Sequence, residues 1–288
     1  MLLIFGLGYA GRAVAAAARA RGMAVLGTVR SGHGPGTVPF DAAAEAIGRA
    51  THLLITAPPD AGGDPVLARH LPAIRAASGR LRWIGYLSST VVYGDRDGGW
   101  VDEDTPPAPS GPRGERRLAA ERAWAALAAA MAPSPALDLF RLAGIYGPGR
   151  SAFDDLRAGT ARRVLKPGHA FGRIHRADIA RAVLAAIDRP PTGAAPRVLN
   201  LADDTPAESA VVIEEAARLL GMPPPPAVPF AVAEAAMSPM ARSFWAENRR
   251  IASRKTQAAL GIGWRYPSYR EGLAAILAAE QAGKDVPE

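Results

Sequence analysis

The sequence has no cysteine among its 288 residues. This absence excludes disulfide bonds, thiolate metal ligands and cysteine nucleophiles, and it fits a cytoplasmic protein. No uncharged apolar run reaches the ~18 residues of a membrane span, and no basic segment precedes a cleavable apolar stretch at the N-terminus. We therefore expect a chain with no signal peptide and no membrane partner, and we predict no metal site.

Negative charge is the scarcer sign: 27 Asp and Glu stand against 34 Lys and Arg, for a formal net charge of +7. The excess is spread along the chain, and no basic run is interleaved with aromatic residues, as is typical of proteins that follow a nucleic acid. We therefore expect no nucleic-acid partner and favour small anionic ligands. The length allows one large domain or two smaller ones.

A glycine fingerprint opens the chain. The apolar run 2–5 leads into glycines with the G-x-G-x-x-G spacing, and an alanine-rich helical stretch follows. At a strand-to-helix junction this spacing gives a tight turn, space for a pyrophosphate and close helix packing, while the helix N-terminus offers free N–H groups to phosphates. The sequence predicts a dinucleotide site, and glycines that serve only a tight turn are the alternative. The predicted cofactor residues here are Gly6, Gly8, Tyr9, Gly11 and Arg12.

The end of the second predicted strand indicates which dinucleotide binds. NAD sites usually carry Asp or Glu there to accept hydrogen bonds from the ribose hydroxyls. This chain has Arg30 and Ser31, and no carboxylate before Asp41. A guanidinium pairs with a 2′-phosphate through two hydrogen bonds, whereas an acid would repel it. We predict NADP rather than NAD, with Arg12 as a further donor; a solvated surface arginine is the alternative for Arg30.

Strand-like and helix-like segments alternate along the first half of the chain. This alternation predicts an α/β fold with a doubly wound parallel sheet of the Rossmann type. Pro72 is expected to kink or break its helix. Ala57 and Pro58, at the end of a predicted strand, are expected to line the cofactor site. The predicted strands lie at 37–40, 51–57, 82–89 and 136–143, and the predicted helices at 64–79 and 115–131.

Helix signals dominate the second half. Capping boxes are predicted at 205–208 and 268–271. A strand–helix unit at 173–188 and a strand at 198–202 are expected to rejoin the first sheet. The expected division is a dinucleotide-binding domain of residues 1–144 plus 171–203 and a smaller, mostly helical C-terminal substrate lobe of residues 145–170 plus 204–288.

Several segments resemble a known family. They are Tyr-Leu-Ser-Ser-Thr-Val-Val-Tyr-Gly at 86–94, Gly-Ile-Tyr-Gly-Pro-Gly at 144–149, Ile-His-Arg-Ala-Asp at 174–178 and the tail 260–273. With the glycine fingerprint, they resemble the extended short-chain dehydrogenases/reductases, the NAD(P)-dependent epimerase/dehydratase superfamily, and most of all its atypical members. The resemblance spans essentially the whole chain. It implies a cofactor along the carboxyl edge of the sheet and a substrate under the small lobe.

The resemblance also implies catalytic residues. Ser89 matches the family's catalytic hydroxyl, which hydrogen-bonds the substrate oxygen as charge develops; a serine that closes its strand is the alternative. Where the family has a Tyr-x-x-x-Lys pair, this chain has Arg113 and Arg117. Arginine stays protonated, so Arg113 cannot pass the proton that the tyrosine passes. Arg117 is expected to bind the nicotinamide ribose.

Another residue would then have to supply the proton. Tyr93 is one candidate, with packing beside the site as its alternative role. Tyr146 lies where the family places backbone near the nicotinamide. His175 has a suitable ordinary pKa, although a structural histidine is the alternative. Asp178 is expected to cap a helix that starts at Ile179.

A basic stretch runs between residues 150 and 173. If its cations face the cleft, they select an anionic substrate; a solvated face is the alternative. The predicted substrate-binding residues are Arg150, Lys166, Arg173 and His175.

Three functions stay open. The favoured one is an NAD(P)-dependent oxidoreductase or epimerase/dehydratase-like enzyme for a small anionic or sugar-like substrate, with Ser89 and a non-standard proton donor. The second is a catalytically silent sensor or regulatory protein that binds NADP(H), and the third is a structural subunit. Because members of the family often dimerise, a homodimer is also expected.

Overall fold

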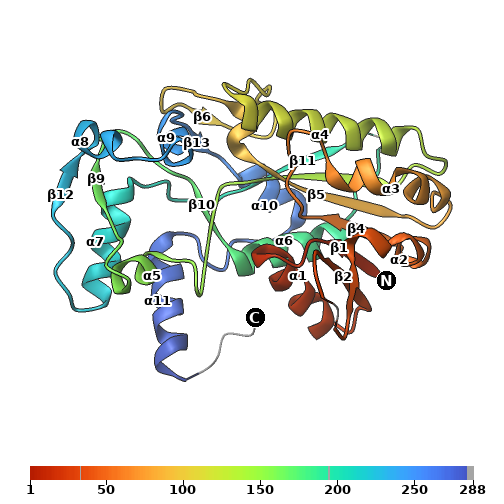
Figure 1. The fold of residues 1–288 in the computed structure, drawn as a ribbon, viewed down its shortest axis with the longest axis horizontal. Helices are drawn as coiled ribbons and strands as arrows, with labels where there is room; N and C mark the ends of the chain where they lie inside the picture. The colour runs from red at the N-terminus through yellow and green to blue at the C-terminus, as the bar shows by residue number, and fades with distance from the viewer. Residues whose placement is uncertain (33, 194, 284–288) are drawn as a thin grey trace.

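A parallel sheet of seven strands forms the centre of the protein (Figure 1). The computed structural model describes residues 1–32, 34–193 and 195–283. The strand order is β11-β7-β5-β4-β1-β2-β3, so the order reverses between β1 and β4. The doubly wound parallel sheet predicted from the alternation is confirmed. Its strands are β1 (Leu2–Phe5), β2 (Val25–Val29), β3 (Thr37–Pro39), β4 (His52–Ile55), β5 (Trp83–Ser89), β7 (Ala136–Leu142) and β11 (Arg197–Leu201).

Helices cover both faces of this sheet because its strands are apolar on both sides. Leu2 and Ile4 of β1 pack with α1 (Tyr9–Ala20) and α6 (Arg176–Asp188) on one face. Leu3 and Phe5 pack on the other face. Alternate residues of a strand point to opposite faces, so one short strand serves two cores. The second face is covered by α2 (Ala44–Arg49), α3 (Pro65–Ala76) and α4 (Pro112–Ala129).

A smaller group of elements lies beside the sheet (left in Figure 1). Tyr146, Phe153, Ile213 and Leu273 are among the residues of its own buried apolar cluster. Most of this lobe is helical, as the sequence predicts. It contains α5 (Ala152–Arg157), β9 (Arg163–Leu165), α7 (Ser209–Leu219), β12 (Ala227–Pro229), α8 (Phe230–Ala235), α9 (Pro239–Trp245) and α11 (Tyr269–Gln281).

Three short parallel pairs join segments that are distant in the sequence. Strand β8 (Gly144–Tyr146) pairs with β10 (Arg173–His175), and β9 pairs with β12. The third pair joins β6 (Trp100–Val101) and β13 (Arg250–Ile251). The remaining elements include α10 (Arg254–Leu260) and the 3-10 turns η1 (Phe40–Ala42) and η2 (Thr90–Tyr93). The strand predicted at residue 173 therefore does not rejoin the central sheet. That prediction was wrong, because this strand, β10, pairs with β8 instead.

Two predicted helix starts are also wrong. Helix α6 begins at Arg176, and the Nδ1 atom of His175 accepts the N–H of Ala177 at 3.2 Å, so His175 rather than Asp178 is the cap. Asp178 instead accepts the backbone N–H groups of Arg265 and Tyr266, at 2.8 and 3.0 Å. A local cap preference is thus overridden by a contact 87 residues away.

The second wrong start is the capping box at 205–208, since α7 begins only after it. The Glu208 carboxylate accepts the N–H of Gly168 at 2.8 Å. The cap at Ser268 is confirmed, because its Oγ accepts the N–H of Arg270 at 3.1 Å. Helix α3 runs through Pro72 without a break.

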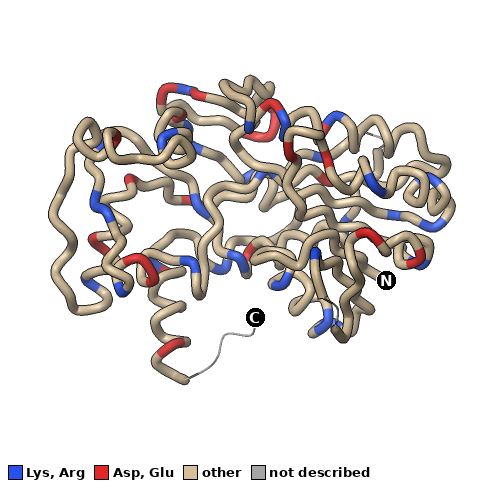
Figure 2. The backbone as a smooth tube through the Cα atoms, in the orientation of Figure 1, with Lys and Arg blue, Asp and Glu red and all other residues tan. Residues whose placement is uncertain are grey.

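Charged residues lie along both parts of the backbone and do not gather on one face in this view (Figure 2). Within the described ranges, no helix combines the length and the apolarity that a membrane crossing requires.

Candidate functional site

The glycine loop between β1 and α1 has a shape that only glycine permits at two positions. Gly6 has a φ of +104°, a Cβ there would lie 2.7 Å from Thr56 Oγ1, and its N–H donates to Thr28 Oγ1 at 3.0 Å. A Cβ on Gly11 would overlap the carbonyl oxygen of Gly6. At Gly8, by contrast, a Cβ would meet no atom within 4 Å. The loop therefore packs tightly on the protein side and is open at its middle glycine.

The N-terminus of α1 faces this opening without a side-chain cap. Gly8 is the N-cap residue, and the first turn contains no acidic residue. Arg12 is exposed one turn further on, and Arg30 and Ser31 are exposed directly after β2. Free N–H groups at the positive end of a helix, with cations nearby, form an anion site.

Ala57 lies beside the same loop. Its N–H donates to the carbonyl of Phe5 at 3.1 Å, and its backbone lies 3.5 Å from the position of a Cβ on Gly6. Pro58, the next residue, is exposed. The structure thus brings the ends of β1, β2 and β4 together, as expected for strands that are neighbours in a parallel sheet.

Ser89 ends β5, the next strand along this edge. It is partly exposed, and its Oγ accepts the N–H of Val91 at 3.4 Å, so the hydroxyl proton is free to bond elsewhere. Arg117 of α4 donates to the carbonyl of Leu87 at 2.9 Å and to the Tyr86 hydroxyl at 3.3 Å. Burial raises the pKa of Tyr86 to about 12. One guanidinium nitrogen of Arg117 therefore holds β5, the strand that Ser89 ends, through both hydrogen bonds.

Arg113 points to a different element. Its guanidinium lies 4.6 Å from the ring centroid of Phe244, which belongs to α9 of the smaller lobe. Burial lowers the pKa of Arg113, and the charge of Arg117 acts in the same direction. Because a guanidinium is ordinarily protonated far above neutral pH, Arg113 still keeps its proton there.

A buried polar network lies under Ser89, and sequence reasoning missed it. Arg141 and Glu121 form an ion pair of 2.8 Å with side chains only 5% and 3% exposed, and Ser88 donates to the same carboxylate at 2.5 Å. The guanidinium carbon of Arg141 also lies 4.8 Å from the ring centroid of Tyr93. The hydroxyl of Tyr93 donates to the side-chain oxygen of Asn200 at 2.8 Å. Tyr93 is fully buried, and this hydrogen bond holds its hydroxyl in the core. The sequence does carry a signal for this network, because Glu121 and Arg141 each stand within an otherwise apolar segment.

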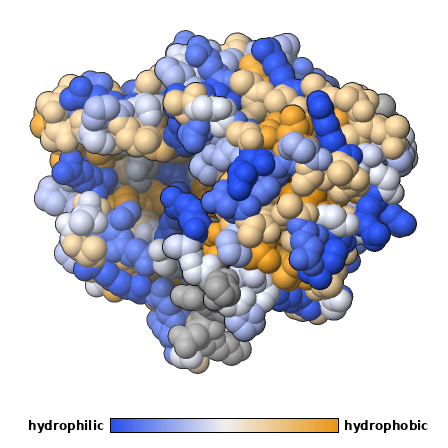
Figure 3. All heavy atoms as spheres, turned by 45° about the vertical axis from the view of Figure 1, so that its right-hand side comes forward, coloured by the Kyte–Doolittle hydropathy of each residue, from blue (hydrophilic) through white to orange (hydrophobic). Residues whose placement is uncertain are grey.

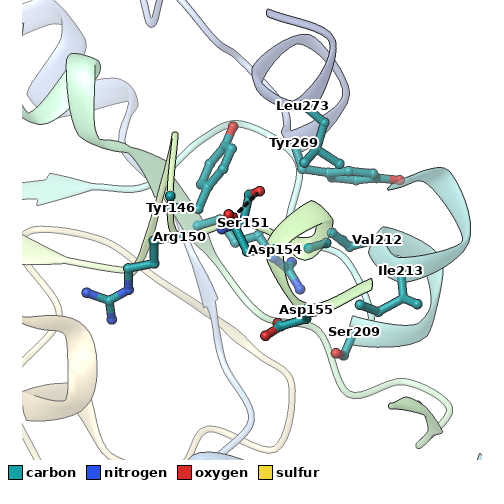
Figure 4. A pocket seen from close by; sticks show the side chains of 13 residues that line it. Tyr146, Arg150, Ser151, Asp154, Asp155, Ser209, Val212, Ile213, Tyr269 and Leu273 are labelled. Carbon is teal, nitrogen blue, oxygen red and sulfur yellow. Dashed lines mark hydrogen bonds between the residues drawn. The ribbon is translucent and has the colours of Figure 1, made fainter. Parts of the chain in front are cut away.

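A pocket of about 390 Å³ opens between α5, α7, α11 and the loop after β8 (Figure 4). This volume lies in the range of small-molecule sites. Val212, Ile213 and Leu273 give it an apolar wall, and Arg173 is a half-buried cation in its lining. One guanidinium nitrogen of Arg173 donates to the carbonyls of Phe171 and Ala207, at 2.9 and 3.0 Å. The surface is hollowed on one face, with hydrophobic residues in the recess and hydrophilic residues on the rim (Figure 3).

Tyr146 and Arg150 also line this pocket. The Tyr146 hydroxyl donates to the carbonyl of Ser268 at 3.3 Å. Burial raises the pKa of Tyr146, and the nearby carboxylate of Asp203 adds to the shift. The phenol is therefore protonated at neutral pH and acts as a hydrogen-bond donor. Asp203 itself is 1% exposed, and neither of its carboxylate oxygens has a hydrogen-bond partner among the described residues.

The two other titratable candidates lie outside the pocket lining. His175 is buried and stacks against Tyr146 and Tyr266, and burial lowers its pKa to about 4, so the ring is neutral. Lys166 donates to the carbonyl of Trp245 at 2.6 Å and lies over the ring of Phe230 at 4.2 Å. Across the described ranges, no three His, Asp or Glu side chains gather in a way that could hold a metal ion.

Comparison with solved structures finds relatives that cover nearly the whole chain. A functionally unknown conserved protein from Silicibacter pomeroyi is 43% identical, with a TM-score of 0.86 over 97% of this chain and 99% of its own. A proposed NAD-dependent epimerase/dehydratase from Methylobacillus flagellatus is 26% identical, with a TM-score of 0.71 over 97% and 98%. Over nearly its whole length the chain is similar to the NAD(P)-dependent epimerase/dehydratase proteins among the short-chain dehydrogenases/reductases. The family resemblance seen in the sequence is confirmed.

Other members of the superfamily share the fold at lower identity. The human epimerase family protein SDR39U1, solved with NADPH, is 20% identical and has a TM-score of 0.77 over 96% of this chain and 99% of its own. This likeness shows the fold of the dehydrogenase/reductase domain and nothing finer.

Two curated relatives match by sequence. The protein YeeZ of Escherichia coli is 29% identical over 244 residues, which are 77% of this chain and 84% of YeeZ. A 3-diazoavenalumate denitrifying reductase of Streptomyces sp is 33% identical over 143 residues, and the match spans 45% of that reductase and 47% of this chain. No family model matches the chain.

Proposed function

We propose that this dehydrogenase/reductase-like protein is an NAD(P)-dependent oxidoreductase or epimerase/dehydratase-like enzyme that prefers NADP and acts on a small anionic or sugar-like substrate. The observation that carries the proposal is the glycine loop, closed on the protein side at Gly6 and Gly11 and open at Gly8. A dinucleotide diphosphate fits this opening at the uncapped N-terminus of α1. When bound, the nicotinamide supplies hydride transfer.

Each group of residues then has a role that its position allows. Arg30 and Ser31, exposed after β2, hold the 2′-phosphate, with Arg12 as a further donor. Ala57 and Pro58 bound the site beside the loop. Arg117 fixes the strand that carries Ser89 and faces the nicotinamide ribose. Ser89 donates its free hydroxyl proton to the substrate oxygen.

The substrate occupies the pocket of the smaller lobe. The similarity to the reductase of Streptomyces supports an oxidoreductase. Arg173 pairs with an anionic group, since among the described residues its half-buried guanidinium donates only to backbone carbonyls. Tyr146 is our candidate for the non-standard proton donor, because it lines the pocket and its hydroxyl can exchange the carbonyl of Ser268 for a substrate oxygen. Tyr93 is not, because it is fully buried and does not line the pocket.

A catalytically silent NADP(H) sensor is the second candidate. Arg113 lies against Phe244 and Arg117 is bonded to the backbone of β5, so neither residue transfers a proton near neutrality. Turnover separates the two functions: an enzyme consumes NADPH with a member of a carbonyl panel and is slowed by Ser89→Ala, whereas a sensor binds NADPH without turnover. The expected homodimer stays a prediction.

The test of cofactor preference is calorimetric titration of NADP⁺ and NAD⁺ into wild type and Arg30→Asp. The lost charge-assisted hydrogen bonds should weaken NADP⁺ about tenfold or more and leave NAD⁺ nearly unchanged. Arg80→Asp is the matched control, with the same change of charge on an exposed residue before β5, at the opposite edge of the sheet. Equal losses for both dinucleotides would overturn the assignment of the 2′-phosphate.

A further inference from the structure

Tyr9 connects the glycine loop to the entrance of the substrate pocket. It is the first residue of α1, and its hydroxyl donates to the carbonyl of Pro148 at 3.0 Å, across 139 residues of sequence. The approach is close: a Cβ on Gly147, whose φ is +155°, would lie 2.7 Å from the Tyr9 hydroxyl oxygen. The loop after β8 is therefore fastened to the start of the helix where the cofactor diphosphate is proposed to bind.

Two arginines converge on the ring of Tyr9. The guanidinium carbon of Arg176, at the start of α6, lies 4.9 Å from the ring centroid, and that of Arg150 lies 5.7 Å from it. Neither arginine forms a salt bridge with any described residue. The acid that most affects Tyr9 is Asp154, which is held by two hydrogen bonds from Ser151.

Arg150 does not face the apolar end of the pocket. Its side chain points away from Ser209 and Ile213, on the opposite side of the group of lining residues (Figure 4). Its guanidinium instead lies beside Tyr9, at the start of the helix that follows the glycine loop. Two cations held against one ring repel each other, and an anion between them relieves that repulsion.

We propose that Arg150 and Arg176 together bind the diphosphate of the dinucleotide and cover the side of it that faces the small lobe. This inference rests on the proposed function, and it refines the expected substrate role of Arg150. The N–H groups at the start of α1 bind one side of the diphosphate, and the two guanidinium groups bind the other. Because Arg150 also lines the pocket, cofactor binding fixes one wall of the substrate site.

The test is calorimetric titration of NAD⁺, NADP⁺ and inorganic pyrophosphate into wild type, Arg150→Gln and Arg176→Gln. The diphosphate is common to both dinucleotides, so each variant should weaken NAD⁺ and NADP⁺ by the same factor, about tenfold. Pyrophosphate should weaken in parallel, and the dependence of affinity on salt should decrease. Arg265→Gln is the control, since Arg265 also stacks on a tyrosine, Tyr266, at 5.5 Å.

The outcomes are distinct. If wild type binds neither dinucleotide, the proposed function fails, and this inference fails with it. If wild type binds both and the glutamine variants bind them equally well, only this inference is overturned. A variant that loses its fold is replaced by Arg150→Lys or Arg176→Lys, which keep the charge and should retain a larger share of the affinity than glutamine does.

Discussion

The carboxyl group of Asp203 should make the stability of this protein fall as the pH rises. The side chain is 1% exposed, and burial raises its pKa to about 8 from an ordinary value of 3.8, against the opposing effect of Arg173. At neutral pH the group is thus protonated in the folded state and ionised in the unfolded state. Its contribution to stability is complete below pH 3.8 and is lost as the pH rises through 8.

Two histidines titrate in the opposite sense. Burial lowers the pKa of His169 and of His175 from 6.5 to about 4. Their contributions are complete above pH 6.5 and are lost as the pH falls through 4. Between pH 6.5 and 8 both histidines are already neutral in the folded state, whereas Asp203 is still titrating there. Over that interval its raised pKa lowers the free energy of unfolding by about 2 kcal/mol.

Urea unfolding of wild type and Asp203→Asn at the two ends of this interval measures the effect. Asparagine cannot ionise, so the variant should lose about 2 kcal/mol less than wild type does on going to the higher pH. Asp97→Asn is the control, because Asp97 is exposed and is not among the charges that act on Asp203, and it should keep the wild-type slope. The reasoning is refuted if wild type and Asp203→Asn show the same slope.

Two further predictions concern the site. Gly11→Ala places a Cβ on the carbonyl oxygen of Gly6, so the loop must open; NADP⁺ binding by calorimetry should be lost, and unchanged affinity would contradict the role of the loop. Glu121→Ala leaves Arg141 buried without its partner and should cost about 3–5 kcal/mol in urea unfolding, more than any exposed pair such as Arg21 with Asp188. Exposed ion pairs contribute about 1 kcal/mol or less to stability. A loss of unfolding free energy in that range would show that the network does not stabilise the fold.

The sequence predicted the parts of the fold that local patterns encode. The glycine spacing from Gly6 to Gly11 and the alternation of apolar segments were enough for the parallel sheet, because each strand is buried on both faces and reads as an apolar run. The same local signals put the predicted cofactor residues at the ends of strands that are neighbours in the sheet. They could not show which strand pairs with residues 173–175, since pairing depends on partners that are distant in the sequence.

The candidate site was harder to predict for the same reason. Asp178 has the sequence pattern of a helix cap, but its carboxylate binds backbone N–H groups at residues 265 and 266. The convergence of Arg150 and Arg176 on Tyr9 depends on three elements brought together by the fold, and nothing in their spacing indicates it. Asp203 did carry a signal, a carboxylate directly after an apolar strand, but its lack of partners is visible only in the structure.

The strand β13, which pairs with β6, and the helix α11 both come near the end of the chain, and this order has a consequence for synthesis. The glycine loop and six of the seven strands of the central sheet come from the first half of the chain, whereas Tyr269 and Leu273, which line the pocket, come almost last. During translation the nucleotide-facing part can therefore assemble while the wall opposite Arg173 is still inside the ribosome. In a nascent chain the glycine loop of the proposed cofactor site therefore emerges before the last residues that line the pocket.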